Sequence, residues 1–120
     1  MNIQWITINV KNMDESKAFY ENFLGLKLIR TFSPSDKITI AFYTADNGMK
    51  IELLENKATF QHQVDNRGIS IGIAFENYND ILKKAREKQM ITVEPQILGK
   101  DMECFFITDP NGIGIQIIKA

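Results

Sequence analysis

The amino-acid sequence predicts an α+β fold made of two βαβββ modules, whose strands form a curved mixed sheet, a cup with the helices on its outer face. A repeated order of strand and helix patterns is the first observation behind this prediction. The second is a near-constant offset between the copies: residues 5–10 match 70–75 at 65 residues, and Gly48 matches Gly112 at 64. Two copies are too few for a repeat array, so the halves of this 120-residue chain are expected to form one domain, residues 1–120.

The first module is expected over about residues 1–56. Residues 5–10 alternate apolar and polar side chains, which is the period of a strand with one face on a core. Asn12 is placed to cap a following helix, whose apolar stripe includes Phe19 and Phe23, and Gly25 supplies its end. Further strands are expected over 26–32, 37–44 and 49–55, with a hairpin turn at 46–48.

The second module, about residues 66–120, repeats this order after a polar linker at 56–68. Asn77 is expected to cap a helix that carries Ile81, Leu82 and Ala85 on one face. Strands follow over 70–75 before the helix and over 91–95, 102–108 and 113–119 after it, with a second Asn-Gly turn at 109–112.

Composition excludes several classes of function. The chain is 44% hydrophobic and 24% charged, with a formal net charge of -1, so no basic surface for nucleic acid is expected. Its apolar runs are too short for a membrane span, and its first residues do not resemble a secretion signal. The single cysteine, Cys104, fits a reducing compartment and a small buried side chain, so we expect a cytoplasmic protein.

The strands divide their side chains between two faces. The apolar face is expected to meet the helices and carries Ile6, Ile8, Val10, Ile51, Leu53, Ile71, Ile73, Phe75, Ile113, Ile115 and Ile117. The other face is mixed in polarity and carries Trp5, Thr7, Asn9, Lys50, Glu52, Leu54, Ser70, Gly72, Ala74, Gly114, Gln116 and Ile118. Small residues leave room there, so this face predicts either a ligand cup or a surface covered by a second chain, and a homodimer fits both.

The sequence closely resembles the vicinal-oxygen-chelate superfamily, which is the glyoxalase/bleomycin-resistance/extradiol-dioxygenase group. The resemblance lies in the pattern of residues 5–29, the NG-MKIELLE segment and the DPNG-IGIQII segment. The resemblance implies that a metal site would use Trp5, Glu52, Ser70 and Gln116. Of these, only Glu52 is an ordinary ligand, because an indole N–H donates only and neutral oxygens bind divalent metals weakly. The sole histidine, His62, lies in the linker. We therefore expect no metal cofactor.

The resemblance also implies that an arginine holding the glutathione carboxylate would stand at Asn9, and the absence of that arginine argues against lactoylglutathione lyase activity. The sequence thus favours a protein with a degenerate metal site that binds a small organic ligand through Trp5, Thr7, Asn9, Glu52, Ser70 and Gln116. One alternative is an enzyme, a glyoxalase-like lyase or isomerase or a dioxygenase-like enzyme, with Glu52 as the catalytic proton carrier. Another is a non-catalytic subunit that binds a protein.

Overall fold

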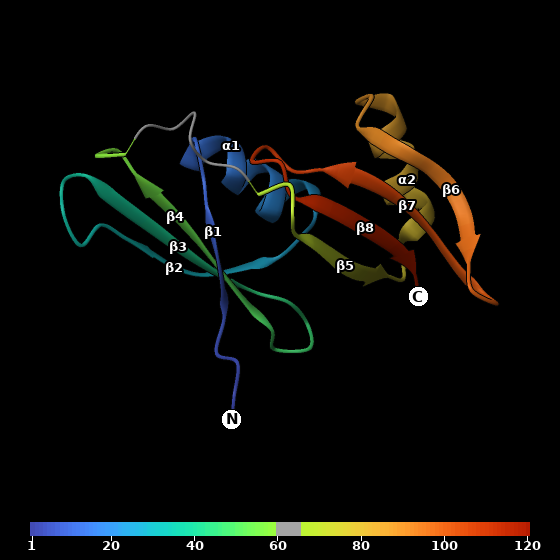
Figure 1. The fold of residues 1–120 in the computed structure, drawn as a ribbon, viewed down its shortest axis with the longest axis horizontal. Coiled ribbons are helices and arrows are strands. Elements are labelled where there is room, and N and C mark those ends of the chain that lie inside the picture. The colour runs from blue at the N-terminus through green and yellow to red at the C-terminus, as the bar shows by residue number, and fades with distance from the viewer. Residues whose placement is uncertain (60–65) are drawn as a thin grey trace. The chain divides into compact units, whose positions relative to one another are not determined.

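A computed structural model describes residues 1–59 and 66–120 of the chain. The chain divides into two compact units, Met1–Asp65 and Asn66–Ala120, and each contains one sheet and one helical segment (Figure 1). The predicted α+β class with two βαβββ modules is confirmed. Among the described residues, no helix combines the length and apolar character needed to cross a membrane.

The first module begins with strand β1 (Ile6–Asn9), followed by helix α1 (Met13–Lys17) and a π-helical segment η1 (Ala18–Phe23). Strands β2 (Lys27–Phe32), β3 (Ile38–Thr44) and β4 (Lys50–Asn56) complete it. The sheet order is β1-β4-β3-β2, and β1 runs parallel to β4 while the other pairs are antiparallel. The last strand of the module therefore lies in the middle of its sheet, with neighbours on both sides.

The second module has the same topology. It contains β5 (Ser70–Phe75), α2 (Tyr78–Glu87), β6 (Ile91–Leu98), β7 (Met102–Thr108) and β8 (Gly114–Lys119). Its sheet order is β5-β8-β7-β6, with β5 parallel to β8. The predicted strand at 91–95 is longer than expected, because β6 continues through Pro95 to Leu98. Proline is tolerated there since β6 is an edge strand whose register shifts between Val93 and Gln96.

One face of each sheet packs on the helix of its own module. In the first module, the Tyr43 hydroxyl of β3 donates to Glu21 of η1 at 2.8 Å, and in the second the rings of Tyr78 and Phe105 meet edge to face, 5.4 Å apart. The buried core includes Ile8, Val10, Ile51, Leu53, Ile113, Ile115 and Ile117, as predicted. The prediction was wrong for Ile6, which is 39% exposed, because β1 is the edge strand of its sheet.

Two local predictions about the helices need correction. The first helix is α-helical only to Lys17 and then widens into the π-helical segment η1, a difference that an apolar stripe at helical spacing does not reveal. Asn12 caps α1 as predicted, because its side chain accepts from the Glu15 amide at 2.9 Å. Asn77 stands at the cap of α2, but its side chain makes no cap hydrogen bond there.

Both Asn-Gly hairpins form, with Gly48 and Gly112 at φ of +87° and +89°. The second turn has an additional support, the buried carboxylate of Asp109. Its Oδ1 accepts from the amides of Asn111 and Ile113 at 2.8 and 2.7 Å, and its Oδ2 accepts from the Asn111 side chain at 3.2 Å. The equivalent position in the first hairpin is Ala45, so only the second turn is held by a side chain in this way.

Tyr43 and Tyr78 are both fully buried tyrosines with different hydroxyl environments. Burial raises the pKa of Tyr43, and the hydrogen bond and negative charge of Glu21 raise it further. Burial is also the main cause that raises the pKa of Tyr78, followed by the charge of Glu103. Glu103 is close enough to the Tyr78 hydroxyl to raise its pKa, but the two make no hydrogen bond of good geometry, whereas the Tyr43 hydroxyl donates to Glu21.

This difference predicts that removing the hydroxyl group affects stability at Tyr43 but hardly at Tyr78. Tyr43→Phe should lower the free energy of unfolding by about 1–2 kcal/mol, because the Glu21 carboxylate loses a charge-assisted partner. Tyr78→Phe should change it by less than about 0.5 kcal/mol, because it removes a hydroxyl that is buried without a hydrogen bond. Urea denaturation of both variants measures the two effects, and equal losses would contradict the assignment.

Candidate functional site

The candidate site lies on the face of the first sheet that points away from its helix, called here the helix-distal face. Residues paired across neighbouring strands share a face, so the register gives the composition of this surface directly. One transverse row runs Arg30–Phe42–Glu52–Thr7 across β2, β3, β4 and β1. The next row runs Phe32–Ile40–Leu54–Asn9. Three of the predicted site residues, Thr7, Asn9 and Glu52, therefore lie on one surface.

Glu52 occupies the centre of the first row. Thr7 Oγ1 donates to Glu52 Oε1 at 2.5 Å, a short distance typical of a hydroxyl bonded to a carboxylate. The Glu52 side chain is only 9% exposed, whereas Thr7 lies on the edge strand and is exposed. Within the described part of the chain, the partner of Glu52 is thus Thr7. Glu52 forms no ion pair with Lys50, which lies two residues earlier on the same strand face, among these residues.

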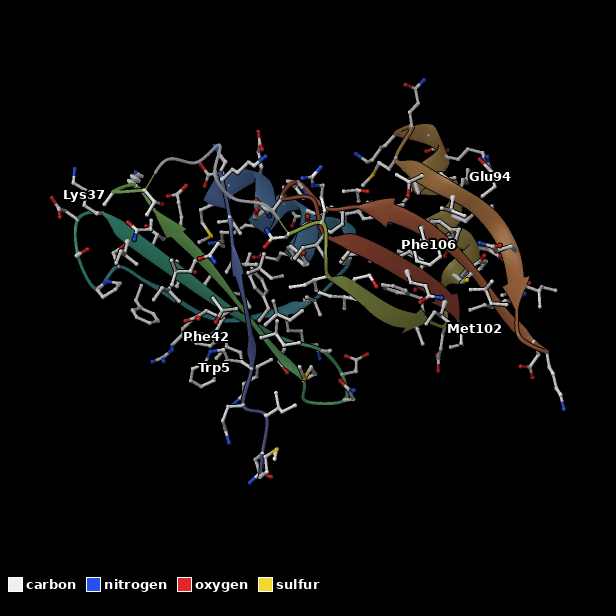
Figure 2. All side chains as sticks on the ribbon, in the orientation of Figure 1. Trp5, Lys37, Phe42, Glu94, Met102 and Phe106 are labelled. Carbon is white, nitrogen blue, oxygen red and sulfur yellow. The ribbon has the colours of Figure 1, made fainter. Side chains whose placement is uncertain are left out.

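Trp5 stands just before β1 and reaches across the sheet to Phe42. Their rings meet edge to face, with centroids 5.3 Å apart and an interplanar angle of 86°. Figure 2 shows these two side chains next to each other. Phe42 is nearly buried, but Trp5 remains 45% exposed. An indole held at one edge and open elsewhere offers a flat apolar surface to a ligand.

Arg30 completes the first row at the outer strand, and sequence reasoning missed it. Its guanidinium lies over the rings of Phe32 and Phe42, with its central carbon 4.7 and 5.4 Å from the two ring centroids. A register shift between Leu28 and Arg30 sets which face Arg30 occupies. Because simple alternation along 26–32 does not include that shift, only the strand pairing could have identified this residue.

The second module places the other two predicted residues, Ser70 and Gln116, on the corresponding face of its own sheet. Gln116 is paired with Gly72 and Phe106, as Glu52 is paired with Thr7 and Phe42. Figure 2 labels Phe106 and Met102, which both belong to β7.

No hydroxyl faces Gln116 from β5, because Gly72 replaces the threonine of the first module. The Gln116 amide instead donates toward Met102 Sδ at 3.5 Å and Cys104 Sγ at 3.4 Å. Cys104 itself is buried, as predicted. The duplicated positions thus keep a phenylalanine neighbour but differ in their polar partners.

Comparison with known proteins identifies the family. The model of the Glyoxalase/Bleomycin resistance protein/Dioxygenase superfamily matches residues 2–117. The chain belongs to this superfamily. A lactoylglutathione lyase of Salmonella typhimurium is 29% identical over 119 residues, which cover 94% of this chain and 88% of the relative. A probable lactoylglutathione lyase of Synechocystis is also 29% identical, with 94% of this chain and 91% of the relative covered.

Solved structures of the superfamily share the fold. The trypanothione-dependent glyoxalase I of Leishmania major has a TM-score of 0.79 at 24% identity, covering 99% of this chain and 86% of that one. TnmS3, an antibiotic-binding protein from Streptomyces, has a TM-score of 0.74 at 13% identity, covering 99% and 95%. Enzymes and a binding protein are therefore both built on this fold, and the side chains of the site must decide the function.

The residues of the first module do not fit the divalent metal that the resemblance to this superfamily implies. The resemblance assigns two ligand positions to this module, where Trp5 offers an indole that cannot coordinate and Glu52 has one oxygen bonded to Thr7. No group of three or more His, Cys, Asp or Glu side chains suited to a metal occurs among residues 1–59 and 66–120. His62 lies outside the described residues. A single carboxylate is too few donors for a structural or catalytic metal.

A separate groove of about 420 Å³ lies on the helix side of the first sheet. Lys17, Glu55 and Lys57 are among its lining residues, and Glu55 Oε2 accepts from the Met13 amide at 2.9 Å. None of the predicted site residues line it. Glu55 already accepts from an amide at the start of α1, so part of its hydrogen-bonding capacity is used within the fold.

Proposed function

We propose that this glyoxalase-superfamily protein binds a small organic ligand on the helix-distal face of its first sheet without a metal. The observation that carries the proposal is the composition of the row around Glu52. A nearly buried carboxylate, an exposed indole and a phenylalanine ring lie together where metal-dependent relatives need several ligands. Apolar surfaces with a few convergent polar groups are typical of small-molecule sites.

Each residue has a distinct role in this proposal. The exposed face of Trp5 stacks on a planar group of the ligand, and the edge contact with Phe42 holds the indole in place. Thr7 uses its hydroxyl to fix one oxygen of Glu52, which leaves the carboxylate to accept a hydrogen bond from the ligand. Asn9, in the next row, adds an amide at the edge strand. Ser70 and Gln116 lie on the corresponding face of the second sheet, and we assign them a ligand-binding role within their own module.

A second candidate function is a glyoxalase-type lyase, which the names of the relatives favour. In that case Glu52 would be the catalytic group and would carry a proton to or from the substrate. The donor set counts against the metal-dependent form of this chemistry, because Trp5 takes a ligand position and Asn9 takes that of the glutathione-binding arginine. An identity of 29% leaves room for a change of function on a retained fold.

We further propose that the protein is a cytoplasmic homodimer. Exposed apolar side chains occur in both modules, among them Ile6, Phe32, Ile69 and Ile97. A second copy that covers some of them would remove this surface from water. A third candidate function is that of a non-catalytic subunit that binds another protein, and co-purification of another chain would support it.

The chain contains one tryptophan, so its fluorescence reports the proposed site directly. Titration with a panel of planar neutral, cationic and anionic aromatic compounds should give a saturable change in Trp5 emission with at least one of them. Glu52→Gln should weaken that binding by about tenfold, the loss of one hydrogen bond to a charged group.

Glu76→Gln is the matched control, because it removes the same charge from an exposed position and should leave binding unchanged. A panel without any response, or an equal affinity in the Glu52→Gln protein, would count against the proposal.

A further inference from the structure

We infer that Arg30 is an anion-binding residue of this face and that the ligand is a planar organic anion, a carboxylate in particular. The inference deepens the proposed function and rests on it. It adds the chemical class of the ligand, which Trp5 and Glu52 by themselves do not specify. Three observations support it: the stacked guanidinium, its unused donors and the charge of the surface around it.

The guanidinium of Arg30 is held by stacking rather than by pairing. It lies over both Phe32 and Phe42, within the distance at which a cation is attracted to the face of an aromatic ring. A side chain held in this way loses less conformational freedom when a ligand binds. The rings come from two neighbouring strands, so the sheet itself sets the position of the charge.

The donors of this guanidinium have no acceptor in the described protein. Arg30 forms no ion pair or hydrogen bond with residues of the described ranges, and its side chain is exposed. Its nearest carboxylate along the row is Glu52, but Phe42 stands on the strand between them. Two strand spacings, about 10 Å, separate the backbones of Arg30 and Glu52. The planar fork of N–H donors therefore remains available for a carboxylate, whose geometry it matches.

The face around Arg30 is positive although the whole chain has a net charge of -1. Lys27 and Lys50 both pair with Thr44, so they lie on the same helix-distal face one row away. Against these three cations the rows contain one carboxylate, Glu52, and its charge is partly satisfied by Thr7. A surface with this balance attracts anions and disfavours cationic ligands.

The row thus orders the parts of a ligand. Its anionic group binds Arg30, its planar body lies against the exposed face of Trp5, and a hydrogen-bond donor at the other end reaches Glu52. A ligand without the anionic group still stacks on the apolar surface, but the Arg30 N–H groups then bind water instead of the ligand. The affinity difference between an acid and its neutral amide therefore measures the role of Arg30 apart from that of the apolar surface.

The test uses 1-naphthylacetate and its neutral amide, 1-naphthylacetamide, as probes, with binding measured by isothermal titration calorimetry. The full chain should bind the acid about tenfold more tightly than the amide, as one charge-assisted contact predicts. Arg30→Gln should remove this preference and leave the amide affinity within about twofold. Arg86→Gln, on α2, is the control with the same change of charge, and it should keep the preference.

The outcomes separate the inference from the proposed function. If both probes bind and change Trp5 fluorescence but with equal affinity, the site stands and the role of Arg30 is overturned. Retention of the preference in Arg30→Gln also overturns it. Arg30→Lys keeps the charge without the planar fork, so this variant should bind the acid less tightly. Unchanged affinity for the acid would show that the charge alone, and not the stacked guanidinium, causes the preference. If neither probe binds, the inference that the site takes an aromatic carboxylate is overturned, whereas the proposed function is decided separately by the panel titration.

Discussion

Replacing Asp109 with alanine should lower the free energy of unfolding by about 3–5 kcal/mol, the largest loss that we expect from a single polar residue of this chain. The carboxylate is buried and accepts hydrogen bonds from two backbone amides and one side-chain amide of the DPNG turn. Alanine leaves these donors without acceptors in a place that water does not reach easily. Such a loss is a large part of the total stability of a small domain, about 5–15 kcal/mol.

Thermal and urea denaturation measure this effect, and two further variants define its origin. Asp109→Asn keeps an oxygen for the two backbone amides, so it should lose only about 1–2 kcal/mol. Asp46→Ala, at an exposed position of the first hairpin, should change stability by less than about 0.5 kcal/mol. A loss for Asp109→Ala no larger than that for Asp46→Ala would show that the carboxylate does not support the turn.

The protein should have no lactoylglutathione lyase activity above the uncatalysed rate, with or without added Ni²⁺ or Zn²⁺. Enzymes accelerate their reactions by about a million-fold or more, so the expected difference from a working relative is very large. The physical reason is the donor set, because the positions to which the resemblance assigns metal ligands in the first module hold an indole and a carboxylate bonded to a threonine. The chain is likewise expected to be purified without a stoichiometric metal.

Metal analysis of protein prepared without chelators checks the second part, and an activity assay beside the Salmonella typhimurium relative checks the first. Metal that is bound stoichiometrically and lost in Glu52→Ala would show that the site still coordinates an ion. Lyase activity that depends on this metal would establish the enzyme and overturn the proposed binding role. Glu76→Ala serves as the control, since this carboxylate is exposed and lies outside the ligand positions.

Much of the fold could be predicted because its signals are local. Alternation of apolar residues identified the strands, and Asn-Gly pairs identified the two hairpins, since these residues readily accept a positive φ. The near-constant offset identified the duplication. The π-helical segment η1 could not be predicted in this way, because its apolar stripe is the same as that of an α-helix.

The sequence by itself determined which groups stand at the matching positions of the two modules. These are the Trp5 indole, the Glu52 carboxylate, the Ser70 hydroxyl and the Gln116 amide. Only the tertiary structure decided what these groups contact. Thr7 and Arg30 are distant from Glu52 along the chain, whereas Phe42 faces it across the β3–β4 hairpin. Strand pairing with a shifted register brings all of them into one row. Hydrogen bonds between strands depend on that register, and residue types alone do not specify it. The character of the site therefore follows from the sheet.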